Sequence, residues 1–195
     1  GCYPTAIQLA LIPLLKMKLI NPINIIADAK SGISGAGRNS ELKLLKSEAD
    51  EDFRAYGIGG HRHLPEIEEN LSKICDDDVK LTFVPHLVPM IRGIHVTIYV
   101  ECEKEFEAQS VFDQFYANEP FVDIMQANMS PNTKSVRASN FCRISFHKEK
   151  NTNKLIIFSV IDNLVKGAAG QAIQNMNIIF DFPENAGINF VPLTP

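Results

Sequence analysis

The sequence predicts an α+β domain built on a mixed, mostly antiparallel sheet with helices on one face. Segments rich in β-branched and aromatic residues are interspersed with helical periodicity, without a strict strand–helix repeat. Two strand-like segments are separated only by a short polar turn, as in a long hairpin. The chain has 195 residues, 45% of them hydrophobic and 22% charged. That is enough for one domain with its own core.

A helix is expected at the start of the chain, where apolar residues recur with a period close to 3.6. Pro4 suits its first turn, so Cys2 lies at, or just before, a helix N-terminus. A buried strand at 23–27 and a Ser/Gly loop at 31–37 come next, and residues 39–46 have the pattern of a short helix.

The remaining elements follow from the same two periodicities and from turn residues. In chain order they are a Gly-rich loop at 56–63, a helix at 65–74, strands at 79–84 and 95–101, a helix at 105–116, a hairpin of 137–147 with 155–161, a last helix at 166–179 and an irregular tail at 182–195 with three prolines. The segment 85–93, which carries two prolines and a glycine, is expected to link the strands at 79–84 and 95–101.

Composition excludes several classes of function. The formal net charge of −4 comes with no basic run, so the sequence gives no sign of nucleic-acid binding. No apolar stretch approaches the ~20 residues of a membrane span. The four cysteines show neither a CxxC pair nor a Cys/His metal spacing, which indicates a reducing, cytoplasmic setting and no metal site; they are Cys2, Cys75, Cys102 and Cys142.

Cys2 is the candidate nucleophile. A thiol at a helix N-terminus faces the positive end of the helix dipole and free backbone N–H groups, which is expected to lower its pKa. The same N–H groups could stabilise an oxyanion. The other three cysteines are expected to be core residues.

The loop residues His61, Arg62 and His63 are the candidate acid/base group, the alternative being a surface loop without a role. In an extended segment the two imidazoles would point the same way. His61 is preferred because Gly59-Gly60 before it permits close approach to a ligand. His63 would instead cap the following helix or bind substrate. Arg38 and Arg92, each beside a glycine, could grip a phosphate or carboxylate, although such arginines are more often solvated.

Five motifs, in order along essentially the whole chain, resemble those of N-acetyl-gamma-glutamyl-phosphate reductases. They are Gly-Cys-Tyr-Pro-Thr-Ala at 1–6, Ser-Gly-Ile-Ser-Gly-Ala-Gly-Arg at 31–38, His-Arg-His-Leu-Pro-Glu-Ile at 61–67, Pro-Met-Ile-Arg-Gly at 89–93 and Asn-Leu-Val-Lys-Gly-Ala-Ala-Gly-Gln at 163–171. Tyr3 and Pro4 help to separate this family from aspartate-semialdehyde dehydrogenases, which share the fold and the cysteine chemistry.

The resemblance implies a glyceraldehyde-3-phosphate dehydrogenase-like C-terminal domain and the NADPH-dependent reduction of N-acetyl-glutamyl 5-phosphate to N-acetylglutamate 5-semialdehyde, a step of arginine biosynthesis. It implies that Cys2 forms a thioester and that His61 is the acid/base. Arg38, Arg62, His63 and Arg92 become candidates for binding the substrate, and Ser34, Gly35 and Asn163 for touching NADP.

The family begins with a Rossmann domain that precedes the cysteine and binds most of the NADP. That domain is missing from this sequence, so we expect a fragment. Residues 1–165 would form the catalytic and dimerisation domain, and 166–195 would pack on the nucleotide-binding domain. A homo-oligomer, dimer or tetramer, is expected. Two alternatives stay open: a dimerisation module inactive by itself, and an acyl-phosphate reductase of the aspartate-semialdehyde dehydrogenase type.

Overall fold

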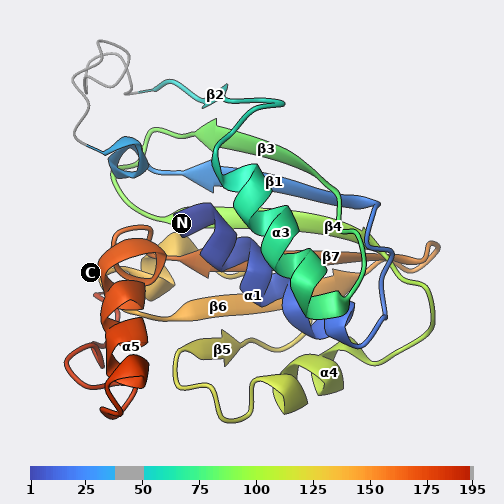
Figure 1. Cartoon of the computed structure of the whole chain (residues 1–195). Coiled ribbons are helices and arrows are strands. Elements are labelled where there is room, and N and C mark those ends of the chain that lie inside the picture. The colour runs from blue at the N-terminus through green and yellow to red at the C-terminus, as the bar shows by residue number, and fades with distance from the viewer. Residues whose placement is uncertain (38–50, 194–195) are drawn as a thin grey trace.

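The computed structural model describes residues 1–37 and 51–193, and its centre is one seven-stranded sheet (Figure 1). The strands are β1 Ile25–Ser31, β2 Arg54–Ala55, β3 Leu81–Leu87, β4 Ile94–Glu101, β5 Val122–Ile124, β6 Cys142–Lys148 and β7 Lys154–Ile161. The short helix expected at 39–46 lies outside the described residues.

The sheet order is β2-β3-β1-β4-β7-β6-β5. β1 pairs parallel with β3, and β5 pairs parallel with β6. The other four pairs, β2 with β3, β1 with β4, β4 with β7 and β7 with β6, are antiparallel. The predicted mixed, mostly antiparallel sheet is therefore confirmed, as is the hairpin of β6 and β7.

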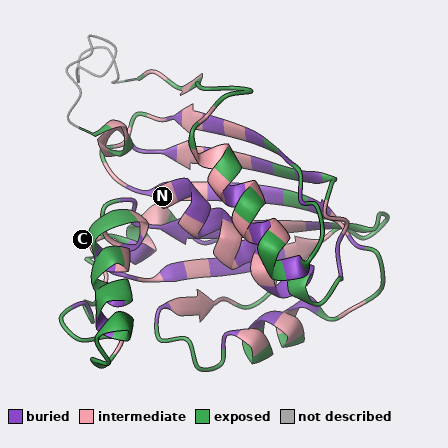
Figure 2. Cartoon of the chain, in the orientation of Figure 1, coloured by how far each residue is buried: buried purple, intermediate pink, exposed green. Residues whose placement is uncertain are grey.

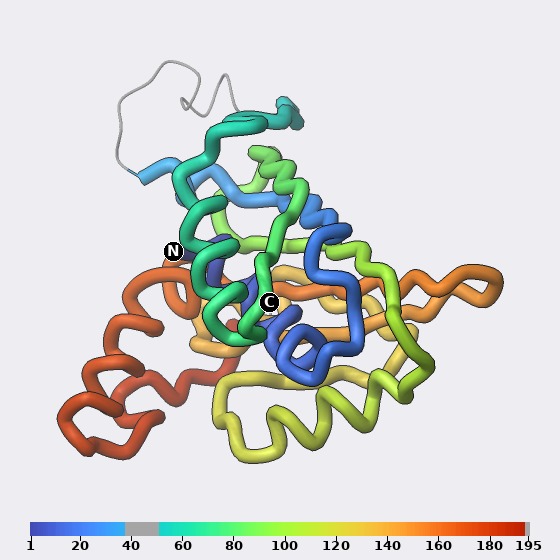
Figure 3. Tube along the Cα trace, turned by 45° about the vertical axis from the view of Figure 1, so that its right-hand side comes forward, coloured from blue at the N-terminus to red at the C-terminus, as the bar shows by residue number. Residues whose placement is uncertain are grey.

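Three helices pack on one face of the sheet: α1 Cys2–Lys16, α3 His63–Cys75 and α4 Ala108–Phe115. α1 crosses the middle strands and packs against α3. The last helix, α5 Gly170–Ile179, follows a π-helical turn at Val165–Ala169. Figures 1 and 3 show that α5 projects from the side of the sheet on which the N-terminus lies, and the tail then turns back, so that the Leu193 N–H donates to the carbonyl of Arg137 at 2.9 Å.

α1 is the centre of the core because one face of it is wholly apolar. Ala6, Ile7, Ala10, Leu11 and Leu14 are each 0% exposed. Burying a leucine or isoleucine side chain contributes roughly 1.5–3 kcal/mol, so this helix is a major source of stability.

Pro13 lies inside α1, although proline usually ends a helix. It has no N–H to donate to the carbonyl of Leu9, four residues earlier. The hydroxyl of Tyr116, just after α4, donates to that carbonyl at 2.5 Å. A tertiary contact thus satisfies the acceptor that the proline leaves open, and α1 continues to Lys16.

Several predicted boundaries are wrong by a few residues. The strand expected at 23–27 is shifted to β1, and β6 begins five residues later than position 137. Pro85 lies inside β3, beside the two-residue edge strand β2, and not in the link after it. α4 starts at Ala108 and not at 105, with the Glu107 side chain as its N-cap. The first turn of the last helix is π-helical.

The strand register brings five chain segments together at one end of the strands. Ser31 pairs with both Leu87 and Ile94, Ile94 pairs with Ile161, and Ile161 pairs with Cys142. In Figure 1 the N-terminus of α1 lies at this end. The loops after β1 and β7 and those before β4 and β6 therefore meet the start of α1.

The opposite face of the sheet is not packed against these helices. Along β1 and β3 every second residue is buried, and the residues between them are partly or fully exposed (Figure 2). Ile26 is 46% exposed and Tyr99 37% exposed on this face. None of the helices that the structure describes is long and apolar enough to cross a membrane.

Candidate functional site

Cys2 is the first residue of α1, as predicted, and it is partly covered by the π turn. A β-carbon added to Gly167 would lie 2.7 Å from the Cys2 Cβ and 3.1 Å from its Cα. Only a glycine allows this approach. The turn at the start of α5 therefore lies directly on the candidate nucleophile.

The expected lowering of the Cys2 pKa is wrong for this structure. Burial raises the pKa of the Cys2 thiol because it removes water from the charged form. Hydrogen bonds from the backbone N–H groups of Tyr3 and of Cys2 itself, and the charge of Arg62, oppose this effect without overcoming it. A thiol in this environment needs a base to deprotonate it.

His61 and His63 lie side by side next to the residues that flank the nucleophile. Their ring centroids are 4.9 Å apart, and Tyr3 contacts both rings edge-on at 5.7 and 6.0 Å. A β-carbon added to Gly1 would lie 2.6 Å from the His63 Nε2. The two imidazoles thus face the same site, but not for the expected reason: the segment is not extended, since Arg62 has helical backbone angles and His63 begins α3.

The helix-capping role suggested for His63 is wrong. The His63 backbone N–H donates to the Nδ1 of His61 at 3.1 Å, so His61 supplies the acceptor at the start of α3. When His61 is neutral, its proton is therefore on Nε2. Burial, aided by the charge of Arg62, lowers the pKa of His61. Burial and the neighbouring His61 lower the pKa of His63 to about 4.

Tyr56 joins this cluster, although the sequence analysis assigned it no role. Its hydroxyl donates to the Tyr3 hydroxyl at 3.1 Å, and its ring contacts His61 at 5.5 Å. The Tyr3 hydroxyl also donates to the carbonyl of His86 at 3.3 Å. The hydrogen bond between the two hydroxyls joins the histidine loop to the start of α1. Tyr3 is only 2% exposed, so this contact is buried.

Ser34, Gly35 and Asn163 lie together, as the resemblance implied for residues that touch one cofactor. Asn163 is 2% exposed, donates to the Ser34 Oγ at 3.0 Å and accepts from the Gly93 N–H at 2.6 Å. Ser34 is partly exposed and Gly35 is exposed. Asn163 thus supports Ser34 from beneath, and the Ser34 hydroxyl keeps its hydrogen for an outside acceptor.

The arginine candidates differ in their environments. Arg62 is exposed at the start of α3, and its charge acts on Cys2 and both histidines. Arg92 is 29% exposed and its Nε lies 2.6 Å from the Oδ2 of Asp162. Arg38 lies outside the described residues.

Tyr56, Asp162 and Gly167 also belong to this site, although none of them was expected there from the sequence. A signal existed for the last two, since both border or belong to the Asn-Leu-Val-Lys-Gly motif. Tyr56 had only its place at the start of the Gly-rich loop. Contacts across the fold, and not sequence spacing, bring these residues to Cys2.

Cys2 is expected to react with iodoacetamide before the other three cysteines. Cys75, Cys102 and Cys142 are 6%, 9% and 0% exposed, whereas Cys2 is partly exposed. Since burial raises the Cys2 pKa, its rate should increase as pH rises above neutrality. Limited alkylation followed by peptide mapping measures the order. Earlier labelling of any buried cysteine would contradict the assignment.

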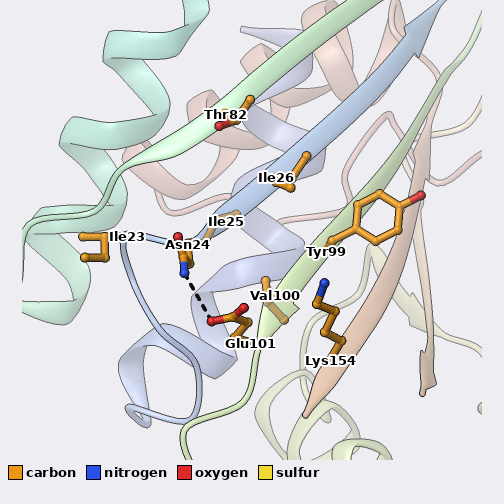
Figure 4. Close-up of a pocket in the computed structure, with 9 residues that line it drawn as sticks. All are labelled: Ile23, Asn24, Ile25, Ile26, Thr82, Tyr99, Val100, Glu101 and Lys154. Carbon is orange, nitrogen blue, oxygen red and sulfur yellow. Dashed lines mark hydrogen bonds between the residues drawn. The ribbon is translucent and has the colours of Figure 1, made fainter. Parts of the chain in front are cut away.

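A pocket lies at the opposite end of the strands, away from Cys2. Its volume is about 220 Å³. Figure 4 shows the residues that line it, among them Asn24, whose side chain donates to Glu101 at 3.2 Å. Tyr99 and Lys154 also line it. It contains no candidate nucleophile. Within the described ranges, no group of three or more His, Cys, Asp or Glu side chains could hold a metal ion.

Comparison with known sequences gives a consistent result. Residues 2–163 match the family described as "Semialdehyde dehydrogenase, dimerisation domain". The chain is 52% identical over its whole length to the N-acetyl-gamma-glutamyl-phosphate reductase of Laribacter hongkongensis and 54% identical to that of Nitrosospira multiformis. It spans 57% of the length of each of these relatives.

Solved structures share the fold. Aspartate semialdehyde dehydrogenase II from Vibrio cholerae matches with a TM-score of 0.72 and 16% identity, over 94% of this chain and 62% of that chain. The aspartate semialdehyde dehydrogenase with NADP from Candida albicans matches with a TM-score of 0.66 and 14% identity, over 92% and 56%. At such identities the likeness shows the fold alone.

Proposed function

Because the chain belongs to the semialdehyde dehydrogenase dimerisation-domain family, we propose that it is the catalytic and dimerisation part of a reductase. The reaction is conversion of N-acetyl-glutamyl 5-phosphate to N-acetylglutamate 5-semialdehyde, within arginine biosynthesis. The observation that carries the proposal is the contact of two histidines with the residues on either side of Cys2. The names of relatives that are 52% to 54% identical to the chain supply the substrate.

The first step uses groups of this chain. A neighbouring imidazole takes the thiol proton, and the Cys2 sulfur attacks the acyl carbon. The acyl–phosphate bond breaks, phosphate leaves and a thioester forms. Backbone N–H groups at the start of α1 support the thiolate, and the same donors suit an oxyanion. In the second step the thioester is reduced to the aldehyde and the thiol is released.

NADPH, when bound, supplies the hydride for the second step. The partly exposed Ser34 hydroxyl and the backbone at Gly35 suit a contact with its nicotinamide side, with Asn163 holding Ser34 in place. Most of the binding affinity would come from the part of the longer relatives that this chain does not span. We therefore expect the chain by itself to be inactive.

The apolar end of the chain supports a partner in that longer protein. Residues of α5 and the tail expose large side chains: Ile178, Ile179, Phe180, Phe182, Phe190, Val191 and Leu193 are 55% to 82% exposed. Patches of this kind usually mark an interface. We propose that these exposed side chains, within the segment 166–195 expected to do so, pack on the nucleotide-binding domain, while the turn at Gly167 packs on Cys2.

The test of the substrate is a comparison of two aldehydes in the reverse direction. The longer protein that contains this chain is assayed with NADP, phosphate and either N-acetylglutamate 5-semialdehyde or aspartate 4-semialdehyde. We expect turnover with the first, and at least about a hundredfold lower kcat/KM with the second, since a pocket built for one set of polar groups rejects another. Preference for the aspartyl substrate would overturn the assignment.

The uncovered face of the sheet supports a homodimer. Replacing Ile26 by aspartate puts a charge on this face, and the protein is expected to shift from dimer to monomer because a buried unpaired charge is costly. Light scattering after gel filtration measures the mass. The matched control is Ile74→Asp in α3, where the residue is 38% exposed on the helical layer, against 46% for Ile26. If Ile26→Asp and Ile74→Asp had the same mass in solution, this interface would be contradicted.

A further inference from the structure

Asp162 has an unusual environment for a carboxylate at the end of a strand. It is 0% exposed. Its Oδ1 accepts hydrogen bonds from the backbone N–H groups of Leu164 at 2.8 Å and Val165 at 3.1 Å. Its Oδ2 accepts from the N–H of Ala138 at 2.6 Å and forms the ion pair with Arg92. A buried carboxylate is tolerated only with such partners, and they hold it in one orientation.

The ion pair with Asp162 engages only one part of Arg92. The contact uses Nε, and among the described residues the two terminal nitrogens have no hydrogen-bond or ion-pair partner. A guanidinium binds carboxylate or phosphate through two such donors. The next residue is held as well, since Gly93 donates to Asn163. Asp162 and Asn163 together therefore fix the Arg92–Gly93 turn.

Asp162 is also linked to the nucleophile. Its carbonyl accepts from the N–H of Gly167 at 3.0 Å, a bond of the i to i+5 type that opens the π turn. Gly167 is the residue that lies on Cys2. Such π turns often occur at functional sites. One residue thus ties an arginine with free donors to the turn that contacts Cys2.

We propose that Asp162 is a positioning residue that aims Arg92 at an anionic group of the substrate bound at Cys2. The anion is either the phosphate of the acyl phosphate or the carboxylate of the acylamino acid, since one guanidinium fork fits both. The proposal rests on the proposed function for the identity of the reaction.

The chain offers a matched control. On β5 and β6, Asp123 and Arg143 form an ion pair with the same Nε to Oδ2 distance of 2.6 Å. There the Arg143 Nε also donates a hydrogen bond to Asp123, whereas the Arg92 Nε contact lacks hydrogen-bond geometry. Their side chains are 41% and 33% exposed, and among the described residues no side-chain hydrogen bond or ion pair joins them to the residues around Cys2. Asp123→Asn therefore removes the same charge from a more exposed Asp–Arg pair outside the site.

The test measures steady-state kinetics of Asp162→Asn, Arg92→Ala, the double variant and Asp123→Asn in the longer protein that contains this chain. Asparagine keeps an acceptor for the Leu164 and Val165 N–H groups and removes the charge beside Arg92. We expect KM for the acyl phosphate to rise about tenfold, the scale of losing one charge-assisted hydrogen bond, with kcat nearly unchanged. The double variant should have the same KM as Arg92→Ala, because the two residues act through one contact. Asp123→Asn should match the unmodified protein.

A second readout is independent of turnover. Inorganic phosphate and N-acetylglutamate are tested separately for slowing Cys2 alkylation, and the more protective one identifies the anion. Asp162→Asn should need about ten times more of it. If that variant does not fold, Asp162→Glu replaces it. Additive KM effects, no protection in the unmodified protein, or equal protection in both proteins would overturn the role of Asp162. If the protein did not turn over the acyl phosphate, the proposed function would be overturned. The protection of Cys2 from alkylation by the anion would still decide the role of Asp162.

Discussion

Replacing Cys2 by serine in the longer protein is expected to lower kcat by about 10⁴-fold or more, the scale seen when a covalent nucleophile is lost. A serine hydroxyl is far less acidic than a thiol, and the ester it would form is harder to reduce than a thioester. Binding should change little because serine and cysteine have nearly the same shape. KM is therefore expected to stay within a few-fold.

The control for this variant is Cys75→Ser. Cys75 ends α3 and is 6% exposed, and its Sγ lies near the carbonyls of Ser72 and Asp77. Its substitution should leave kcat near the unmodified value after correction for folded protein. A rapid-quench search for a covalent acyl group on residue 2 completes the test. Retention of turnover by Cys2→Ser would mean that another residue attacks the substrate.

The second large effect is expected for His61→Ala, which should lower turnover by about 10²–10⁴-fold, the usual range for losing a general acid or base. Its Nδ1 accepts from the His63 backbone N–H, so the neutral ring carries its hydrogen on Nε2 and can donate it to substrate, whereas taking up a proton requires Nδ1 to give up the bond from His63. Since burial raises the Cys2 pKa, proton removal at this site matters more than a helix N-terminus alone would suggest.

His63→Ala is expected mainly to raise KM. The His61 and His63 rings lie at similar distances from Tyr3, 5.7 and 6.0 Å, and the His63 ring lies against Gly1, so proximity by itself does not separate them. The pKa of His63 is about 4, so this imidazole stays neutral across the physiological range and suits hydrogen bonding to substrate.

The pH profile of kcat/KM distinguishes the two histidines. The pKa of His61 is lowered from its ordinary value of 6.5, so the acidic limb should fall below pH 6.5 and disappear in His61→Ala. His63→Ala should keep the limb. If His63→Ala abolished turnover while His61→Ala left it nearly intact, the two roles would have to be exchanged.

Periodicity and turn chemistry predicted the fold class, the helix that begins at Cys2 and the hairpin of β6 and β7. These signals are local, so a sequence carries them directly. The predicted ends of helices and strands were wrong where a contact with a distant part of the fold determines them. α1 passes through Pro13 because Tyr116 satisfies the Leu9 carbonyl, and no pattern within α1 indicates this.

The sequence by itself determined which residues carry the candidate chemistry. Cys2 was identified by its place at a helix start, and His61, Arg62 and His63 by their Gly-flanked loop. Only the tertiary structure decided their electrostatics and their support. The Cys2 pKa rises because the thiol is buried, and part of the cover comes from Gly167, which is 165 positions away in the chain. Burial of this kind is a property of the whole fold. Asp162 and Tyr56 joined the site for the same reason: hydrogen bonds between loops at one end of the strands depend on strand register, which couples segments far apart in sequence.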